Sequence, residues 1–207
     1  MTSYEIDGVV PVIDPTAFVH DTASIIGDVI IGPGCYIGPF ASLRGDFGRI
    51  IVGEGSNVQD SCVIHAFPGA DCVLEPNSHV GHAVVLHGCT VRSYALIGIG
   101  SIVLDGAEIG ENALIGAGSL VTAGTIIPPG TMAIGSPARV VKPLDETTSE
   151  WKRNGVVIYQ QLAQRSLSTL RVVEPLTAVE PDRKRVSTGR DLSVPLHESR
   201  SGARHTD

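Results

Sequence analysis

The chain has 207 residues and a formal net charge of −7, and 43% of its residues are hydrophobic while only 4% are aromatic. This length predicts one domain with appendages, and the acidic balance argues against a nucleic-acid-binding surface. No signal peptide and no apolar run that could span a bilayer occur, which favours a cytoplasmic location. The four cysteines lack CxxC spacing, so we expect buried thiols rather than disulfides at Cys35, Cys62, Cys72 and Cys89.

Six-residue repeats occupy the chain from residue 14 to residue 141, and residues 1–13 are predicted to be an extended lead-in that caps the first coil. A short fixed period predicts a solenoid, in which three hexads close a triangular coil and each aliphatic side chain stacks on its copy one coil away. A β-sandwich would instead show alternation with turns about every 8–12 residues. The pattern resembles that of the hexapeptide-repeat proteins, which implies a β fold, a single-stranded left-handed parallel β-helix. The repeated aliphatic positions are Ile25, Ile31, Ile37, Leu43, Val52, Val58, Ile64, Leu74, Val80, Leu86, Val91, Ile97, Val103, Ile109, Ile115, Val121 and Ile127.

Beyond the repeats the pattern changes, and residues 142–172 are predicted to form a C-terminal helical segment. Asp145 or Thr148 is suited to cap its start. A largely apolar stripe at helical spacing indicates packing along the solenoid or against a neighbouring subunit. Residues 173–207 are rich in Pro, Arg and Ser, so we expect an extended, largely disordered tail. The stripe consists of Tyr159, Leu162, Ser166 and Leu170.

Two histidines share one position of the repeat. His65 follows Ile64 and His87 follows Leu86, so each is the second residue of its hexad. They are 22 residues apart, which equals three hexads plus a four-residue excursion near residues 66–72. We therefore expect both on one face, one coil apart, where parallel strands stack at roughly 4.8 Å and two imidazoles can share one ion.

A third histidine, His82, occupies a different hexad position and should point away from this pair within its own chain. If His82 is also a ligand, it must come from an adjacent subunit, as a threefold homotrimer with inter-subunit sites allows. Three imidazoles with an open fourth position are typical of catalytic Zn²⁺, although Fe²⁺ or Co²⁺ also suits imidazole. The alternative is that these are ordinary surface histidines. His79 lies outside the register and is expected at the surface.

Several polar motifs resemble those of the γ-class carbonic anhydrase group of hexapeptide proteins. The resemblance implies that Arg44 and Asp46 form an interface ion pair beside the metal, and that Asn57 and Gln59 orient its bound water. By the same resemblance, Tyr159 corresponds to a tyrosine that a C-terminal helix brings to the site. The matching motifs are Leu43-Arg44-Gly45-Asp46, Asn57-Val58-Gln59-Asp60, His65, Gly81-His82 and His87-Gly88-Cys89.

The sequence departs from the fast carbonic anhydrases of this class at two places. Phe47 and the acid-poor loop Ala66-Phe67-Pro68-Gly69-Ala70 stand where those enzymes carry acidic residues. Hydration of CO₂ needs a group that carries a proton away after each turnover. We therefore do not expect fast carbonic anhydrase activity, whereas an apolar rim suits an organic acyl group.

A closer resemblance rests on segments inside and outside the repeats, namely Tyr4–Gly8, Leu43–Ile50, Glu150–Lys152, Val173–Leu176 and Glu180–Arg185. In these segments the chain resembles the hexapeptide subgroup of phenylacetate degradation and its carnitine-operon relative. That subgroup is associated with thioesterase activity, so the resemblance implies a metal-dependent acyl-CoA thioesterase whose metal-bound hydroxide attacks the thioester. The alternatives are a γ-class carbonic anhydrase, a metal-free hexapeptide acyltransferase and a non-catalytic trimeric scaffold.

Overall fold

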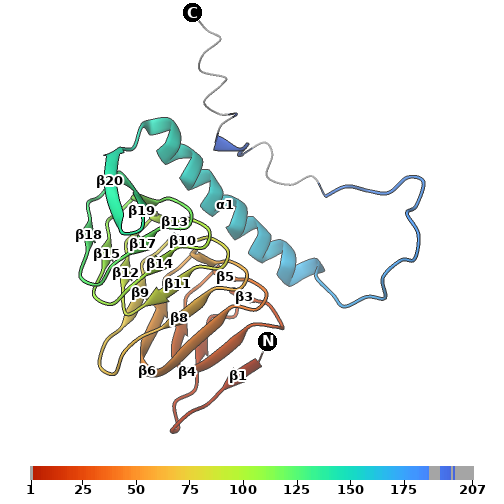
Figure 1. Cartoon of the computed structure of the whole chain (residues 1–207). Coiled ribbons are helices and arrows are strands. Elements are labelled where there is room, and N and C mark those ends of the chain that lie inside the picture. The colour runs from red at the N-terminus through yellow and green to blue at the C-terminus, as the bar shows by residue number, and fades with distance from the viewer. Residues whose placement is uncertain (1, 187–191, 197, 199–207) are drawn as a thin grey trace, which may run out of the picture.

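The computed structural model describes residues 2–186, 192–196 and 198. They form a parallel β-helix of about seven coils followed by one long helix, so the fold predicted from the repeats is confirmed (Figure 1). Residues 173–186 are exposed and contain no helix or strand. The remainder of the predicted tail lies largely outside the described residues.

The strands build three faces of a prism. The first, the histidine face, contains the N-terminal parts of β4 (Ser24–Ile31) and β6 (Ser42–Val52), then β8 (Val63–His65), β11 (Val85–His87), β14 (Ile102–Val103) and β17 (Leu120–Val121). The second contains β2 (Val12–Ile13), the C-terminal parts of β4 and β6, then β9 (Cys72–Leu74), β12 (Thr90–Val91), β15 (Glu108–Ile109) and β18 (Ile126–Ile127). The third, the helix face, contains β3 (Phe18–Val19), β5 (Tyr36–Ile37), β7 (Asn57–Val58), β10 (His79–Val80), β13 (Leu96–Ile97), β16 (Leu114–Ile115) and β19 (Thr131–Gly135).

The repeated aliphatic residues form the core. All of the positions predicted from the six-residue period are at most 2% exposed. On the histidine face they stack in register from Leu43 through Ile64, Leu86 and Val103 to Val121. Burial of each such side chain contributes about 1.5–3 kcal/mol. All four cysteines are free and buried, as predicted.

The coils differ in length where the sequence pattern slips. The commonest spacing between partners on adjacent coils is 18 residues, as between Ile102 and Leu120. The loop between β8 and β9 lengthens one coil, so that His65 pairs with His87 across 22 residues. The next coil is one residue short, and Val73 pairs with Thr90.

The two ends of the β-helix are finished differently. β1 (Thr2–Tyr4) pairs with Ser24–Ile26 of β4 and extends the histidine face, while the side chains of residues 2–10 remain exposed. At the other end β19 turns back into β20 (Ala138–Pro143), and these two strands are antiparallel. The last predicted coil is therefore a hairpin rather than another parallel turn.

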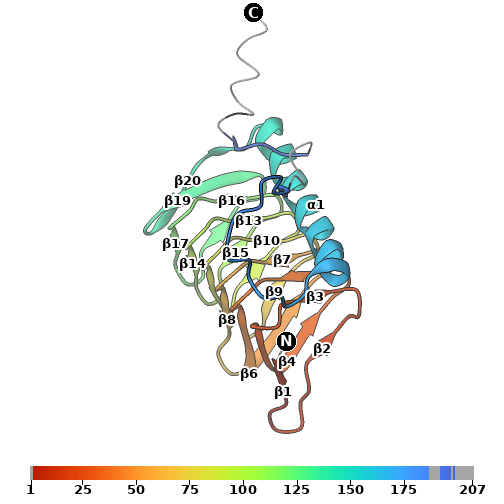
Figure 2. The same cartoon turned by 90° about the vertical axis from the view of Figure 1, so that its right-hand side faces the viewer.

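Helix α1 (Glu146–Thr169) lies along the helix face of its own chain (Figures 1 and 2). Asp145 caps it, because its side chain accepts from the backbone N–H of Thr148. Lys152, Val156 and Ala163 are buried against the coils. The predicted apolar stripe is confirmed only in part, since Leu170 is 57% exposed. No helix in the described part of the chain combines the length and apolarity of a membrane span.

Candidate metal centre

The imidazoles of His65 and His87 lie side by side on the histidine face. Strands β8 and β11 hold them in register, one coil apart. Their ring centroids are 5.2 Å apart, and Nδ1 of His65 lies 3.2 Å from Nε2 of His87. Both side chains are largely shielded from solvent, at 12% and 25% exposed. The predicted pairing of these two rings is therefore present.

In each ring, the nitrogen that points away from the other histidine is hydrogen-bonded to a carboxylate; we call it the far nitrogen. Asp46 Oδ1 lies 3.0 Å from Nε2 of His65, and Asp105 Oδ1 lies 2.6 Å from Nδ1 of His87. Arg44 donates to the other oxygen of Asp46 at 2.5 Å. Partial burial opposes ionisation of Asp46, but the hydrogen bonds from Arg44 and His65 outweigh it and lower its pKa.

This arrangement fits a divalent cation. The carboxylates accept hydrogen bonds from the far nitrogens, so in neutral rings the facing nitrogens, Nδ1 of His65 and Nε2 of His87, carry lone pairs. Two lone pairs directed toward each other repel, and a proton or a cation between them offsets this repulsion. Two nitrogens bound to one tetrahedral zinc at about 2.0–2.1 Å lie about 3.3–3.4 Å apart, close to the 3.2 Å observed. Histidine ligands commonly donate their other N–H to a carboxylate in this way. We call His65, His87, Asp46 and Asp105 the His65–His87 cluster.

Two phenylalanines flank the cluster. The ring of Phe47 lies 5.4 Å from that of His65, and the ring of Phe67 lies 5.0 Å from that of His87. Both are more than half exposed at the rim. The rim is therefore apolar at both positions where the sequence lacks the acidic residues of the fast carbonic anhydrases.

A second group of polar residues lies at the end of strands β7 and β10, on the helix face. Nε2 of Gln59 lies 3.1 Å from Oδ1 of Asn57 and 2.8 Å from Nε2 of His79. Nearby, Asp60 Oδ2 holds Nδ1 of His82 at 3.0 Å, which leaves Nε2 of His82 available as a ligand. We call Asn57, Gln59, His79 and His82 the Gln59–His79 cluster.

The expectation that His79 lies at the surface is wrong. His79 pairs in register with Asn57, and its Nδ1 is buried without a hydrogen-bond partner in the described part of the chain. Burial, followed by the charges of Lys152 and His82, lowers its pKa to about 4. His79 is therefore neutral near pH 7 and fixes the amide of Gln59.

Tyr159 approaches this second cluster from helix α1. Its ring meets that of His79 edge-on at 5.3 Å and that of Tyr36 at 5.4 Å. Burial, with smaller contributions from Tyr36 and Asp60, raises the pKa of its phenol. Tyr159 thus lies beside His79 rather than beside His65 and His87.

The predicted site residues accordingly fall into two clusters on different faces. Arg44, Asp46, His65 and His87 lie on the histidine face, while Asn57, Gln59, His82 and Tyr159 gather at the helix face. Among the described residues of one chain, no three His, Cys, Asp or Glu side chains converge to hold a metal. A three-histidine site would therefore require a second chain.

Two further residues of these clusters have a spacing signal that the sequence reasoning did not use. Asp105 follows His87 by 18 residues, which is three hexads, and so occupies the same corner one coil on. His79 follows Asn57 by 22 residues, the interval that also separates His65 from His87. Adding the length of one coil to the position of His87 gives Asp105, and adding it to the position of Asn57 gives His79.

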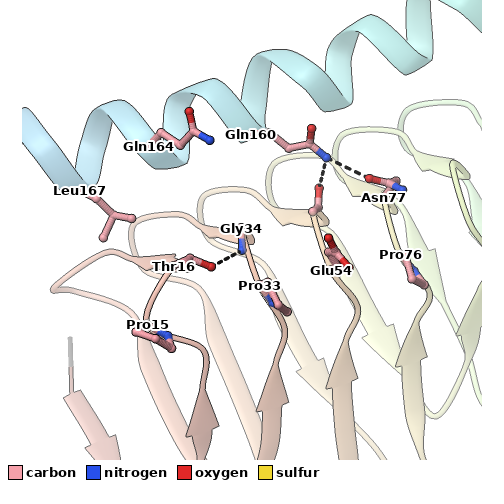
Figure 3. A pocket seen from close by; sticks show the side chains of 11 residues that line it. Pro15, Thr16, Pro33, Gly34, Glu54, Pro76, Asn77, Gln160, Gln164 and Leu167 are labelled. Carbon is pink, nitrogen blue, oxygen red and sulfur yellow. Dashed lines mark hydrogen bonds between the residues drawn. The ribbon is translucent and has the colours of Figure 1, made fainter.

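Three grooves among the described residues border helix α1, and the one of about 460 Å³ at its C-terminal end, beside Phe18 and His20, contains none of the predicted site residues. The first, of about 410 Å³, lies under its N-terminal half and includes Gln59, His79 and His82 in its lining. The second, of about 800 Å³, lies between its C-terminal half and the turns of the first coils, where Gln160 donates to the carbonyl of Gly55 and to Asn77 (Figure 3). This larger groove contains none of the predicted site residues, so the smaller one is the groove connected to candidate chemistry.

Comparison with known proteins agrees with the fold. The family described as bacterial transferase hexapeptide (six repeats) matches residues 88–123. The carnitine operon protein CaiE of Salmonella agona is 45% identical over 192 residues, covering 93% of this chain and 97% of that protein. CaiE of Escherichia coli is 42% identical over 193 residues, covering 93% and 98%.

Two solved structures are also similar. One is a Bacillus cereus protein whose name proposes it as an acetyltransferase; it is 42% identical with a TM-score of 0.79, covering 80% of this chain and 96% of that one. The other is a hexapeptide transferase family protein from Anaplasma phagocytophilum, 38% identical with a TM-score of 0.76, covering 78% and 96%. With relatives of this identity along nearly its whole length, the chain belongs to the hexapeptide-repeat family, in the group that contains CaiE.

Proposed function

We propose that the protein is a metal-dependent acyl-CoA thioesterase that works as a homotrimer with its sites between subunits. The observation that carries this proposal is the pair of imidazole nitrogens 3.2 Å apart, each ring held from behind by a carboxylate. His65 and His87 of one subunit and His82 of the next are the proposed ligands of Zn²⁺, with Fe²⁺ or Co²⁺ also compatible.

The surface beside the paired histidines supports a subunit contact. An outward-facing column on the histidine face is apolar along four successive coils, in register from Val63 through Val85 and Ile102 to Leu120. Val63 is 44% exposed and Ile102 is 39% exposed in the single chain. Burial of this column between copies would be favourable and would bring a second chain next to His65 and His87.

The chain's own residues then have distinct tasks. When bound, the cation supplies a Lewis acid and makes water nucleophilic near neutral pH. Asp46 and Asp105 fix the tautomers of His65 and His87. Gln59, held by Asn57 and by neutral His79, can accept a hydrogen bond from the attacking water through its carbonyl oxygen and so orient it.

The apolar rim favours a thioester over CO₂. Phe47 and Phe67 pack on the rings of His65 and His87, so they shield the site from bulk water and offer contact to an acyl group. An acyltransferase is the second candidate, because the names of two structural relatives include the word acetyltransferase or transferase. It would use the same thioester but pass the acyl group to an acceptor other than water.

The test combines elemental analysis with two assays on the purified protein. We expect about one divalent ion per subunit, and thiol release from phenylacetyl-CoA without any added acyl acceptor. Because all four cysteines are buried, a thiol reagent should report released CoA with little background. The matched control is His20→Ala, which should keep both the metal and the activity. His20 lies outside both clusters, and among the described residues its side-chain hydrogen bonds go to Thr22. Metal-loaded protein that hydrates CO₂ but releases no thiol would refute the proposal, and thiol release only with an acceptor would favour the acyltransferase.

A further inference from the structure

The groove under the N-terminal half of α1 has a floor made by the coils. Leu96 and Leu114 pair in register on β13 and β16 and point away from the core, because their neighbours Ile97 and Ile115 point into it. They are nevertheless only 8% and 7% exposed. Trp151, Gly155 and Tyr159 of α1 line the opposite wall, and the volume of about 410 Å³ falls within the range of about 300–1,000 Å³ that is usual for ligand sites.

Among the described residues, the lining offers no ammonium or guanidinium group that is available to a ligand. Lys152 supplies the one side-chain amine in this part of the chain, and its Nζ is occupied by the carbonyls of Tyr94, Asn112 and Ala113. Lys152 is 1% exposed. A phosphate therefore finds no partner in the groove among the described residues, whereas an uncharged apolar group meets leucine, isoleucine and tryptophan side chains.

One end of the groove lies at the Gln59–His79 cluster. Gln59 and His82 of that cluster line the groove, and His79 lies between Gln59 and the wall that Tyr159 forms. A substrate whose reacting carbonyl lies beside Gln59 can therefore extend an attached chain along Leu96 and Leu114 toward Trp151. At the Trp151 end, Trp151 Nε1 donates to the carbonyl of Val194 at 2.9 Å, and Ser193 and Leu196 join the lining.

We propose that this groove holds the acyl part of the substrate, an uncharged aliphatic or aryl group of medium length, while the charged part of CoA stays outside. The inference rests on the proposed thioesterase function and adds the substrate class that the site selects. The shared residues, the apolar floor and the occupied amine of Lys152 are the observations that support it.

The test uses Trp151, the single tryptophan of the chain, as a fluorescent reporter in the groove. Each buried methylene contributes about fourfold in affinity. Octanoyl-CoA should therefore bind at least about tenfold more tightly than butanoyl-CoA and change the emission of Trp151. CoA alone should leave the emission unchanged. Equal affinities for the two esters, or equal changes with CoA alone, would overturn the proposal.

A matched pair of variants locates the effect. Ala117 lies at an exposed turn on the rim of the groove, and Ala123 occupies the corresponding exposed turn six residues later but does not line it. Ala117→Phe should fill the rim and reduce the preference for octanoyl-CoA at least about fivefold, whereas Ala123→Phe should keep it. An unchanged preference in Ala117→Phe overturns the proposal. A fall in molar mass with unchanged preference also overturns it, because the groove would then be a contact between copies.

The groove and the proposed reaction can fail separately. If octanoyl-CoA binds with the predicted chain-length preference, and Ala117→Phe removes it, the groove assignment holds even if no thiol is released. If thiol is released with the same kcat/KM for butanoyl-CoA and octanoyl-CoA, the thioesterase stands and the groove assignment is wrong.

Discussion

Mixing two inactive variants tests whether the site is shared between subunits. His65→Ala removes one of the paired rings, and His82→Ala removes the ring on the other face; each alone should lose the metal and the activity. A site between subunits needs an intact His65–His87 pair from one chain and an intact His82 from its neighbour. A mixed trimer contains the two variants in a 2:1 or a 1:2 ratio. In either arrangement one of the three subunit contacts joins an intact pair to an intact His82, so about one third of the sites are complete.

The control mixture uses two variants of the same face. His65→Ala and His87→Ala both damage the pair, which β8 and β11 of one chain supply together, so no combination of these subunits restores a site. His82 is 43% exposed, and replacement of an exposed side chain should change stability by less than about 0.5 kcal/mol.

Co-expression with two different tags, followed by purification through both, yields the mixed trimers. Bound metal by elemental analysis and thiol release from phenylacetyl-CoA should both reach about a third of the wild-type value in the first mixture and stay at background in the control. Recovery in neither mixture would mean that His82 and the pair do not meet across subunits. Recovery in both would mean that His65 and His87 do not act together.

Three further predictions concern the residues around the site. Asp105→Asn should weaken metal binding by about 10–100-fold, because the variant lacks the carboxylate that orients His87. Competition with a chelator measures the metal affinity, and an unchanged affinity would show that Asp105 does not belong to the site. In the metal-free protein, His79 should lower the stability by up to about 3 kcal/mol as the pH falls from about 6.5 to 4. The reason is that the unfolded chain binds a proton that buried His79, with its pKa lowered to about 4, excludes. Urea unfolding should therefore show a steeper loss of stability over this pH range in the wild type than in His79→Gln, and equal slopes would contradict the assignment. Leu86→Ala, at a fully buried core position, should cost about 2–5 kcal/mol, whereas Ile126→Ala, at a position 71% exposed, should change stability by less than about 0.5 kcal/mol; equal urea midpoints for the two variants would contradict the column of stacked side chains.

The sequence by itself determined the β-helix and the register of its histidines. Side chains alternate inward and outward along each short strand, so a six-residue period assigns every aliphatic residue to the core without any long-range information. The same counting placed His65 opposite His87, because a coil is a whole number of hexads plus the observed excursion. The same counting applies to Asp105, which follows His87 by 18 residues and could have been predicted in this way.

Only the tertiary structure decided the surroundings of Gln59. His79 is buried because helix α1 crosses the strand that carries it, with Gly155 and Tyr159 against its ring. Neither the position nor the direction of that crossing is encoded in the hexads, since it depends on how a segment 76–80 residues further along the chain packs onto the finished coils. The antiparallel β19–β20 hairpin and the groove under α1 have the same origin, because each forms between elements whose contact no local period specifies.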